Sequence, residues 1–172
     1  MHMSKRIERP FEGLALLPNF PVTLLTCDQN VMAAVSFHYY STRPPAVMVG
    51  VRVDNLTYKL ITEKKEFGVN FPPTALMEKV RYIGEVSGRK EDKWAATGLT
   101  KQPSTVIKSV LVAECPLNLE CTVVHQVAYP GSHTWFIGKI EAVHVDSTYD
   151  RGDVLLYWMQ EFRRTGERLL KY

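Results

Sequence analysis

The first third of the chain carries short apolar runs of the length and composition typical of β-strands. Runs rich in β-branched and aromatic residues, bounded by turn residues, occupy Pro21–Cys27, Val31–Tyr40 and Ala46–Val53. Pro44 and Pro45 cannot donate hydrogen bonds to a central ladder, so we expect them between the second and third runs or at the first residue of the third. The pattern predicts three strands in this part of the chain.

The middle of the chain changes to helical spacing in two places. Residues 56–66 carry a narrow apolar stripe with lysines near its end, and Asn55 or Thr57 is the candidate N-cap. Residues 73–86 have a proline in the first turn and apolar residues three and four positions apart. Between these two predicted helices, FGVNF at residues 67–71 has the composition of a further strand.

The second half returns to apolar runs after a polar loop at residues 87–94. These runs cover residues 105–115, 118–129 and 134–146, and the tail from residue 153 begins like a strand and finishes like a helix. Many strands, two helices and no regular alternation between them favour a mostly antiparallel β-barrel or sandwich. Hydrophobic periodicity alone does not distinguish these two architectures.

Composition and charge narrow the class of protein further. The 172 residues suit one domain over 1–172, with residues 1–10 as a flexible N-terminal extension. Hydrophobic residues make up 45% and charged residues 23%, which is typical of a globular protein. The net charge of +3 is spread along the chain, and no run approaches the ~20 apolar residues of a membrane span. We therefore expect neither nucleic acid nor a membrane as a partner.

The cysteines and histidines do not suggest a metal site. Cys27, Cys115 and Cys121 are an odd number without a CxxC pair, which argues against a disulfide framework or a zinc site and favours the reducing cytoplasm. Beyond His2, the histidines stand at widely separated positions: His38, His125, His133 and His144. A nucleophile elbow, a Walker A loop, a dinucleotide glycine fingerprint and HExxH are all absent.

One segment carries residues suited to binding an anion. Arg52 ends a predicted strand, and Asn55, Thr57 and Tyr58 follow where a helix begins. Free backbone N–H groups, the helix dipole, hydroxyls and a guanidinium together can hold a phosphate. Considered alone, a capped helix beside a solvated arginine is an equally good interpretation.

Two further positions carry candidate chemistry. The loop at 87–94 contains Arg89, Lys90 and Lys93, and on its own it is an ordinary charged turn. His133 begins a strand directly after a turn, where a side chain can reach into a cleft without disturbing the core.

Several segments, taken together and in order, resemble one family. They are NFPVTLLTCD leading into NVMAAVSF, the diproline before VMVGVR, TYKLITEKKEFGVNFP, VSGRKEDKWAATGL, LECTVV and GSHTWFIGKIEAV. From about Phe20 to about Asp146 the chain resembles the flavin reductase-like family, the FMN-binding split barrels, and within it the flavoredoxin-type branch. The resemblance implies a mainly β fold, an antiparallel Greek-key split β-barrel with short helical insertions, that forms a homodimer with its flavin sites close to the subunit interface.

The resemblance also implies a set of site residues. The small side chains of MAAVS would form the floor under the flat flavin ring. The implied cofactor-binding residues are Asn30, Ala34, Ser36 and Phe37 at the ring, Arg52, Asn55, Thr57 and Tyr58 at the phosphate and ribityl chain, Lys93 from the loop, and Trp158 or Phe162 from the tail. His133 and Lys93 are the implied catalytic residues, with Ser132 where the family usually has an aspartate.

The implied function is electron transfer through FMN. The leading hypothesis is an oxidoreductase that takes a hydride from NADH or NADPH and passes electrons to free flavin, ferric iron or a partner redox protein. The alternatives are a non-enzymatic FMN electron carrier of the flavoredoxin type and a split-barrel binding protein with no redox role.

Overall fold

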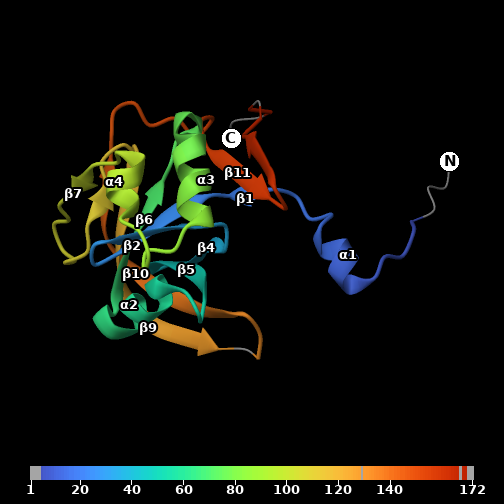
Figure 1. The fold of residues 1–172 in the computed structure, drawn as a ribbon, viewed down its shortest axis with the longest axis horizontal. Coiled ribbons are helices and arrows are strands. Elements are labelled where there is room, and N and C mark those ends of the chain that lie inside the picture. The colour runs from blue at the N-terminus through green and yellow to red at the C-terminus, as the bar shows by residue number, and fades with distance from the viewer. Residues whose placement is uncertain (1–4, 129, 167, 170–172) are drawn as a thin grey trace.

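The apolar runs form one seven-stranded antiparallel sheet in the computed structural model, which describes residues 5–128, 130–166 and 168–169 (Figure 1). Its strands are β2 (Thr23–Cys27), β3 (Asn30–Ala34), β4 (Phe37–Thr42), β5 (Pro45–Arg52), β6 (Glu66–Phe71), β9 (Leu117–Ala128) and β10 (His133–Val145). Their order across the sheet is β3-β2-β6-β9-β10-β5-β4. Pro45 is the first residue of β5, as expected of a proline that cannot donate to the ladder.

The sheet is rolled into a barrel because its two edge strands are consecutive in the chain. Only residues 35 and 36 separate the end of β3 from the start of β4. Such a link spans at most about 11 Å, whereas a flat sheet of seven strands would be roughly 29 Å wide at about 4.8 Å per spacing. The Cα atoms of β3 and β5 accordingly approach within 8 Å of one another. The single strand predicted for Val31–Tyr40 is therefore wrong, since the chain turns within it from one edge of the barrel to the other.

The barrel interior is filled by alternate residues of its strands. Phe67 and Phe136 are fully buried there. A Cβ at Gly138 would lie 2.4 Å from the ring of Phe67, so the ring occupies the space that a side chain at residue 138 would need. Residues of β2 and β3 that point outward join a second apolar cluster with Val80 and Ile83. The β2 strand is thus buried on both faces.

Short helices cover the outside of the barrel. They are α1 (Pro10–Leu14), α2 (Leu56–Lys64), the 3₁₀ helix η1 (Thr74–Leu76), α3 (Met77–Glu85) and α4 (Lys93–Thr97). The predicted helix at 56–66 forms as α2 and ends at Lys64, because the backbone of its C-cap residue Lys65 is left-handed with φ 58°. The predicted helix at 73–86 begins with the 3₁₀ turn, and α4 lies partly in the segment predicted as a polar loop.

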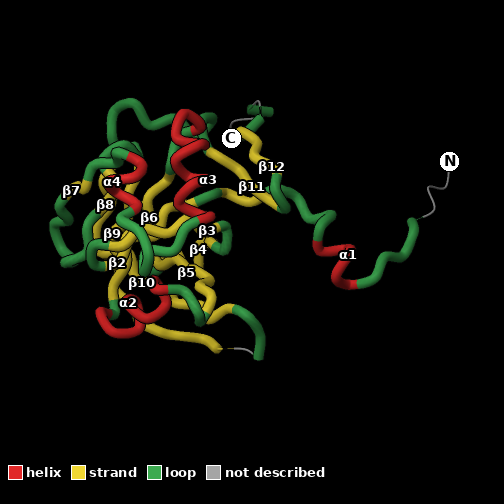
Figure 2. The backbone as a smooth tube through the Cα atoms, viewed as in Figure 1, coloured by secondary structure: helices red, strands yellow, loops and turns green. Residues whose placement is uncertain are grey.

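Residues 105–115, predicted as a strand, instead form a covering loop with only a short strand in it (Figure 2). That strand, β8 (Leu111–Val112), pairs with β7 (Lys101–Gln102). The loop crosses the outer face of β6 and β9, where polar side chains accept hydrogen bonds from its backbone N–H groups. Glu66 Oε1 accepts from the N–H groups of Lys108 and Ser109 at 2.9 and 2.8 Å. Asn70 Oδ1 accepts from the N–H of Val112 at 2.9 Å. The prediction of a strand at residues 105–115 is wrong, because most of this segment donates its backbone hydrogen bonds to side chains and not to a neighbouring strand.

Glu120 is the main attachment point of this loop. Its buried carboxylate accepts hydrogen bonds from the backbone N–H groups of Thr105, Val106 and Ile107 at 2.7, 2.7 and 2.8 Å. His144 Nε2 lies 2.6 Å from Glu120 Oε1. Burial alone would raise the pKa of this carboxyl, yet these hydrogen bonds lower it from 4.5 to about 2.

Acid is therefore expected to destabilise the fold through Glu120. Its folded pKa lies below its unfolded value, so the stabilisation is present above about pH 4.5 and is lost as pH falls toward 2. The loss in the free energy of unfolding amounts to about 3 kcal/mol, at ~1.4 kcal/mol for each pKa unit between the unfolded and folded values of Glu120. Urea unfolding from pH 6 to about pH 2.5 measures it. Glu120→Gln should flatten this dependence, and an equally steep curve in that variant would contradict the assignment.

The C-terminal segment forms a hairpin against the N-terminal end of the barrel. β1 (Phe20–Pro21), β11 (Leu155–Trp158) and β12 (Glu161–Arg164) make a three-stranded sheet in the order β1-β11-β12. The strand expected at the start of the tail is present as β11. The prediction of a helix after it is wrong for the described residues, because β12 follows there instead. Residues 1–4 of the predicted extension, Tyr129 of a predicted strand, and residues 167 and 170–172 of the tail lie outside the described residues.

Within the part of the chain that the structure describes, no helix combines the length and apolarity needed to cross a bilayer, and no cluster of side chains suits a metal ion. Cys27, Cys115 and Cys121 are buried and free.

Candidate functional site

The link between β3 and β4 lies against β5 at a position that only glycine allows. The N–H of Gly50 donates to the carbonyl of Ser36 at 2.7 Å. A Cβ at residue 50 would lie 2.8 Å from Ser36 Cβ and 3.3 Å from the ring of Trp135, its partner on β10. The link between β3 and β4 is thereby packed closely against β5, and this contact fixes its position.

Arg52 and His133 face each other where β5 ends and β10 begins. They are paired in the sheet register. Arg52 Nε and Nη2 donate to the carboxylate of Asp54 at 3.2 and 3.1 Å, and this contact lowers the pKa of Asp54. Partial burial, together with the positive charge of Arg52, lowers the pKa of His133. The imidazole is therefore favoured in its neutral form at pH 7, with Ser132 Oγ 2.8 Å from its Nδ1.

The first turn of α2 lies beside this pair with its backbone donors uncapped. Asn55 is the N-cap residue, but its side chain bonds to Met32 Sδ at 3.2 Å and makes no capping hydrogen bond. Thr57 is buried, and its Oγ1 accepts from Asn30 Nδ2 at 2.8 Å, which joins α2 to the start of β3. The N–H groups of this turn are thus available to an anion.

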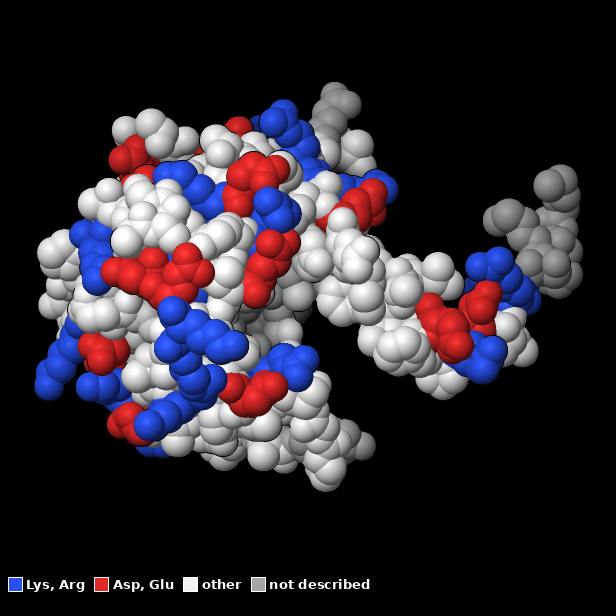
Figure 3. Space-filling view, in the orientation of Figure 1, with Lys and Arg blue, Asp and Glu red and all other residues white. Residues whose placement is uncertain are grey.

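The loop from α3 to α4 brings two basic side chains to the same end of the barrel. Arg89 Nη1 donates to the carbonyl of Asp54 at 2.7 Å, which places the guanidinium beside the turn that follows Arg52. Lys93 is buried, and its Nζ donates to the carbonyl of Ile83 at the end of α3 at 2.8 Å. Burial lowers the pKa of Lys93 from 10.5 to about 8. Figure 3 shows basic side chains gathered over α2 and this loop.

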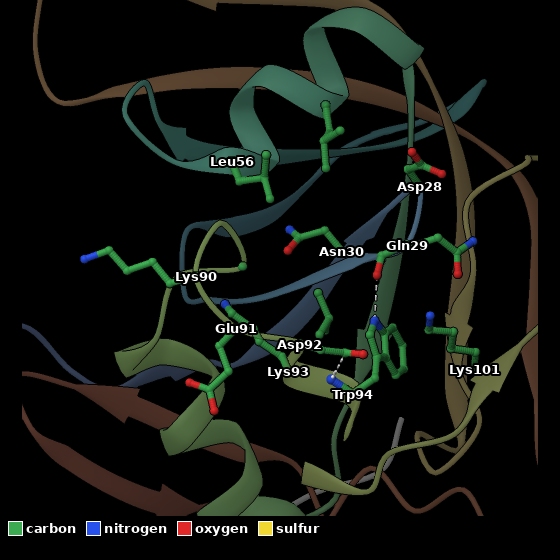
Figure 4. A pocket seen from close by; sticks show the side chains of 13 residues that line it. Asp28, Gln29, Asn30, Leu56, Lys90, Glu91, Asp92, Lys93, Trp94 and Lys101 are labelled. Carbon is green, nitrogen blue, oxygen red and sulfur yellow. Dashed lines mark hydrogen bonds between the residues drawn. The ribbon is translucent and has the colours of Figure 1, made fainter. Parts of the chain in front are cut away.

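A polar hollow of about 520 Å³ opens between α2, the start of β3 and the α3–α4 loop (Figure 4). Leu56 lies on one side, the loop residues Lys90 to Trp94 lie opposite, and Asn30 lies between them. Lys101 lines the hollow beside the indole of Trp94, whose Nε1 donates to the carbonyl of Gln29 at 2.7 Å.

A smaller apolar hollow of about 260 Å³ lies at the other end of β3. Ala33, Ala34 and Val35 form one wall, and Tyr157 and Phe162 of the C-terminal hairpin form another. The α3 helix lies directly over this part of β3, since a Cβ at Gly84 would lie 3.7 Å from Ala33 Cβ, an ordinary contact distance. Part of the small-residue run therefore makes room for a helix.

The family model described as Flavin reductase like domain matches residues 18–166. The chain belongs to the flavin reductase-like family.

Solved structures place this flavin reductase-like chain in the flavoredoxin branch. It superposes on the flavoredoxin from Methanosarcina acetivorans with a TM-score of 0.87 and 29% identity, over 99% of this chain and 95% of that one. For the flavoredoxin of Desulfovibrio vulgaris (Miyazaki F) the TM-score is 0.84 and the identity 30%, over 98% and 97% of the two chains. An uncharacterized protein of Archaeoglobus fulgidus is 37% identical over 122 residues, which is 70% of this chain and 68% of that one. The split-barrel fold and the family expected from the sequence are confirmed, and membership supports a flavin-related redox function.

The site residues expected of this flavin reductase-like chain fall into four groups. Asn30, Asn55, Thr57 and Lys93 surround the start of β3, and Ser36, Arg52 and His133 lie at the adjoining end of β5. Phe37 and Tyr58 pack against the barrel interior, where Phe37 meets Phe71 and Tyr58 meets Phe136 at centroid distances of 5.3 and 5.7 Å. Trp158 contacts the N-terminal segment, whereas Phe162 reaches the apolar hollow beside Ala34.

Sequence reasoning did not assign a role to Gly50 or Arg89 in this site, and it included Met32 only as part of the MAAVS floor. Arg89 was recognised only as a loop charge, because nothing in a linear sequence shows that the loop folds back onto the turn after β5. Gly50 carried a possible signal, since a glycine inside an apolar strand often marks a close approach of backbone.

The residues present fit a flavin nucleotide. The small side chains of Ala34 and Ser36 at the link between β3 and β4 suit the flat ring, and the uncapped first turn of α2 with two guanidinium groups suits a phosphate. Asp54 pairs with Arg52, so an arriving phosphate would have to compete with that carboxylate.

Proposed function

We propose that this chain is an FMN-containing oxidoreductase that accepts a hydride from NADH or NADPH and delivers electrons to free flavin, ferric iron or a redox partner. The convergence of Arg52, Arg89, the uncapped start of α2 and the Ser36–Gly50 contact at one end of the barrel carries the proposal. Bound FMN would supply the hydride-accepting ring. The protein's part is to hold the ring and phosphate and to leave one ring face open to a donor.

The ring end of the proposed site is the strand link. Ala34, Ser36 and Phe37 would contact the ring, and the hydrogen bond from the N–H of Gly50 to the carbonyl of Ser36 would hold this link in position. An aromatic residue of the C-terminal hairpin, Phe162 or Trp158, would shield its edge. Phe162 is the better placed of the two, because it shares the apolar hollow with Ala34.

The phosphate end of the proposed site is the start of α2. Arg52, Asn55, Thr57 and Tyr58 belong to this end, and Asn30 fixes its position through Thr57. Lys93 would add positive charge from the α3–α4 loop. Its ammonium is already bound to the carbonyl of Ile83, so we assign it a role in setting the potential near the flavin and no proton transfer.

Changing Arg52 to alanine is expected to weaken FMN binding by about 10- to 100-fold, because a charge-assisted contact to the phosphate is lost. Fluorescence titration of the apoprotein with FMN measures the dissociation constant. Arg43→Ala is a matched control, since Arg43 lies in the turn between β4 and β5, away from the proposed phosphate site. Equal affinity in wild type and Arg52→Ala would remove Arg52 from the site.

His133 is proposed to position the nicotinamide or its pyrophosphate at the open ring face. Its depressed pKa and its hydroxyl neighbour Ser132 favour a neutral ring that accepts or donates hydrogen bonds without carrying charge. The donor carbon would need to come within roughly 3–3.5 Å of the flavin ring for transfer.

Anaerobic mixing of the FMN-loaded protein with NADH and with NADPH tests the reaction. Rapid loss of the oxidised flavin absorbance with either donor supports the oxidoreductase. A spectrum unchanged by both donors overturns it and leaves the second candidate, an FMN electron carrier that exchanges electrons with another redox protein. The likeness to two flavoredoxins at 29% and 30% identity favours that candidate. A protein that binds no flavin would contradict both.

We also propose a cytoplasmic location and a homodimer. The three free, buried cysteines are consistent with a reducing compartment. For the dimer, support comes from exposed apolar side chains on the barrel, Tyr39 and Tyr40 on β4 and Val124 and Val127 on β9, which are 43–65% exposed.

A further inference from the structure

The N-terminal segment from Lys5 to Leu17 leaves the body of the protein with its apolar side chains unburied (Figure 1). Ile7, Phe11 and Leu16 are 98%, 81% and 64% exposed, and Leu14 and Leu17 are also exposed. Side chains of this size are normally buried, and five within eleven positions are more than isolated surface residues. We call residues 5–17 the arm.

The base of the arm is held in a defined position by the C-terminal hairpin. Trp158 Nε1 donates to the carbonyl of Leu14 at 2.9 Å, and the rings of Trp158 and Phe20 meet edge to face at 5.1 Å. Asn19 Nδ2 donates to the carbonyl of Glu161 at 3.0 Å. These contacts direct the arm away from its own barrel, so its apolar residues are presented to another molecule.

The charges on the arm argue against an anionic partner. Arg6 pairs with Glu8 at 2.6 Å and Arg9 with Glu12 at 3.5 Å, so these four charges cancel within the arm. Membranes and nucleic acids select strongly basic segments, which this arm is not. The recognition it offers is apolar.

The position of the arm favours a second copy of this chain. In the view of Figure 1 the arm and the end of the β9–β10 hairpin leave the body on the same side, with β4 and β5 between them. Tyr39, Tyr40, Val124 and Val127 belong to β4 and β9. An isologous pair would satisfy both surfaces at once, because the arm of each protomer would lie over this side of the other.

We propose that the arm clasps a second copy of this chain across the side of the barrel that carries β4, β5 and the β9–β10 hairpin. The inference rests on the proposed homodimer and deepens it. Arg52 and His133 lie at the same end of β5 and β10, so the clasp would also close one side of the proposed flavin site. Arm exchange of this kind adds buried apolar area without changing the barrel.

Sedimentation equilibrium of the full chain and of a variant lacking residues 1–17 tests the clasp. Truncation is expected to raise the dimer dissociation constant by at least about 100-fold, because each dimer loses two arms. Phe11→Ser with Leu14→Ser should raise it on the order of 10-fold or more, while leaving the backbone carbonyl that binds Trp158. Glu12→Gln, on the same short helix, is the matched control and should change it by less than about threefold.

Each other outcome has a defined meaning. A dimer whose dissociation constant is unchanged by truncation overturns the clasp and leaves the homodimer. A full chain that is monomeric at every concentration overturns both. None of these outcomes bears on flavin reduction, which the absorbance assay tests separately.

Discussion

Replacing Glu120 by alanine is expected to destabilise the fold by about 3–5 kcal/mol. The change leaves three backbone N–H groups of residues 105–107 and the hydroxyl of Thr105 without their acceptor under a covering loop. Each buried donor without a partner costs about 1–3 kcal/mol, and the imidazole of His144 loses its carboxylate partner as well. Urea denaturation followed by circular dichroism measures the loss.

Glu114 provides the matched control for this variant. Its carboxylate accepts from the backbone N–H of Thr100 at 2.9 and 3.1 Å in an exposed position. Glu114→Ala should therefore cost less than about 1 kcal/mol, since water can replace the lost acceptor. Similar losses in the two variants would show that the covering loop is not attached through Glu120.

The second large effect is expected at the centre of the barrel. Phe67→Ala should cost about 3–5 kcal/mol, because the ring is fully buried and fills the space over Gly138 and Cys121. A cavity would remain, since neighbouring strands are held by their ladders on both sides and cannot collapse into it. Thermal or urea unfolding measures the change.

Phe67→Leu is the control that separates volume from position. It keeps most of the apolar bulk and should cost less than half as much as the alanine variant. If Gly138→Ala, introduced into Phe67→Leu, costs much less than it does in the wild type, the ring and the glycine are coupled as their packing implies. Additive losses would contradict that coupling.

The sequence was most informative where the hydrophobic pattern and the backbone pairing agree. β2, β5, β6, β9 and β10 lie within one or two residues of their predicted limits, because each is a run of strand length with apolar residues buried on at least one face. The two predicted helices also form, and α3 lies where its apolar stripe meets β3. Local pattern determined these elements.

The errors occur where long-range contacts override local pattern. Residues 105–115 have a strand-like composition, but Glu66, Glu120 and Asn70 take their hydrogen bonds. The tail turns back at Met159 and Gln160, both with positive φ, and pairs as a hairpin despite its helical spacing. Neither the acceptors nor the pairing partner can be identified without the fold.

The candidate site was predictable in part. The resemblance placed Arg52, Asn55 and Thr57 together, and their proximity follows from a strand running into a helix. The loop contact of Arg89 depends on the path of a distant segment, and so does the contact of Trp158 with the arm. Arg89 was missed for this reason, whereas Lys93 and His133, which also come from distant segments, were assigned to the site only through the resemblance.

The two-residue link between β3 and β4 has a consequence for how the barrel assembles. The two edges of the sheet are tethered from the outset, so bringing them together carries almost no loop-closure entropy. The distant pairings are elsewhere: Arg52 meets His133, 81 positions later, and Glu66 meets Thr122, 56 positions later. We therefore expect the pairing of β5 with β10 and of β6 with β9 to be the slow steps of barrel assembly, whereas β3 and β4 are joined from the start. The link that joins them contains Ser36, where the flavin ring is proposed to bind.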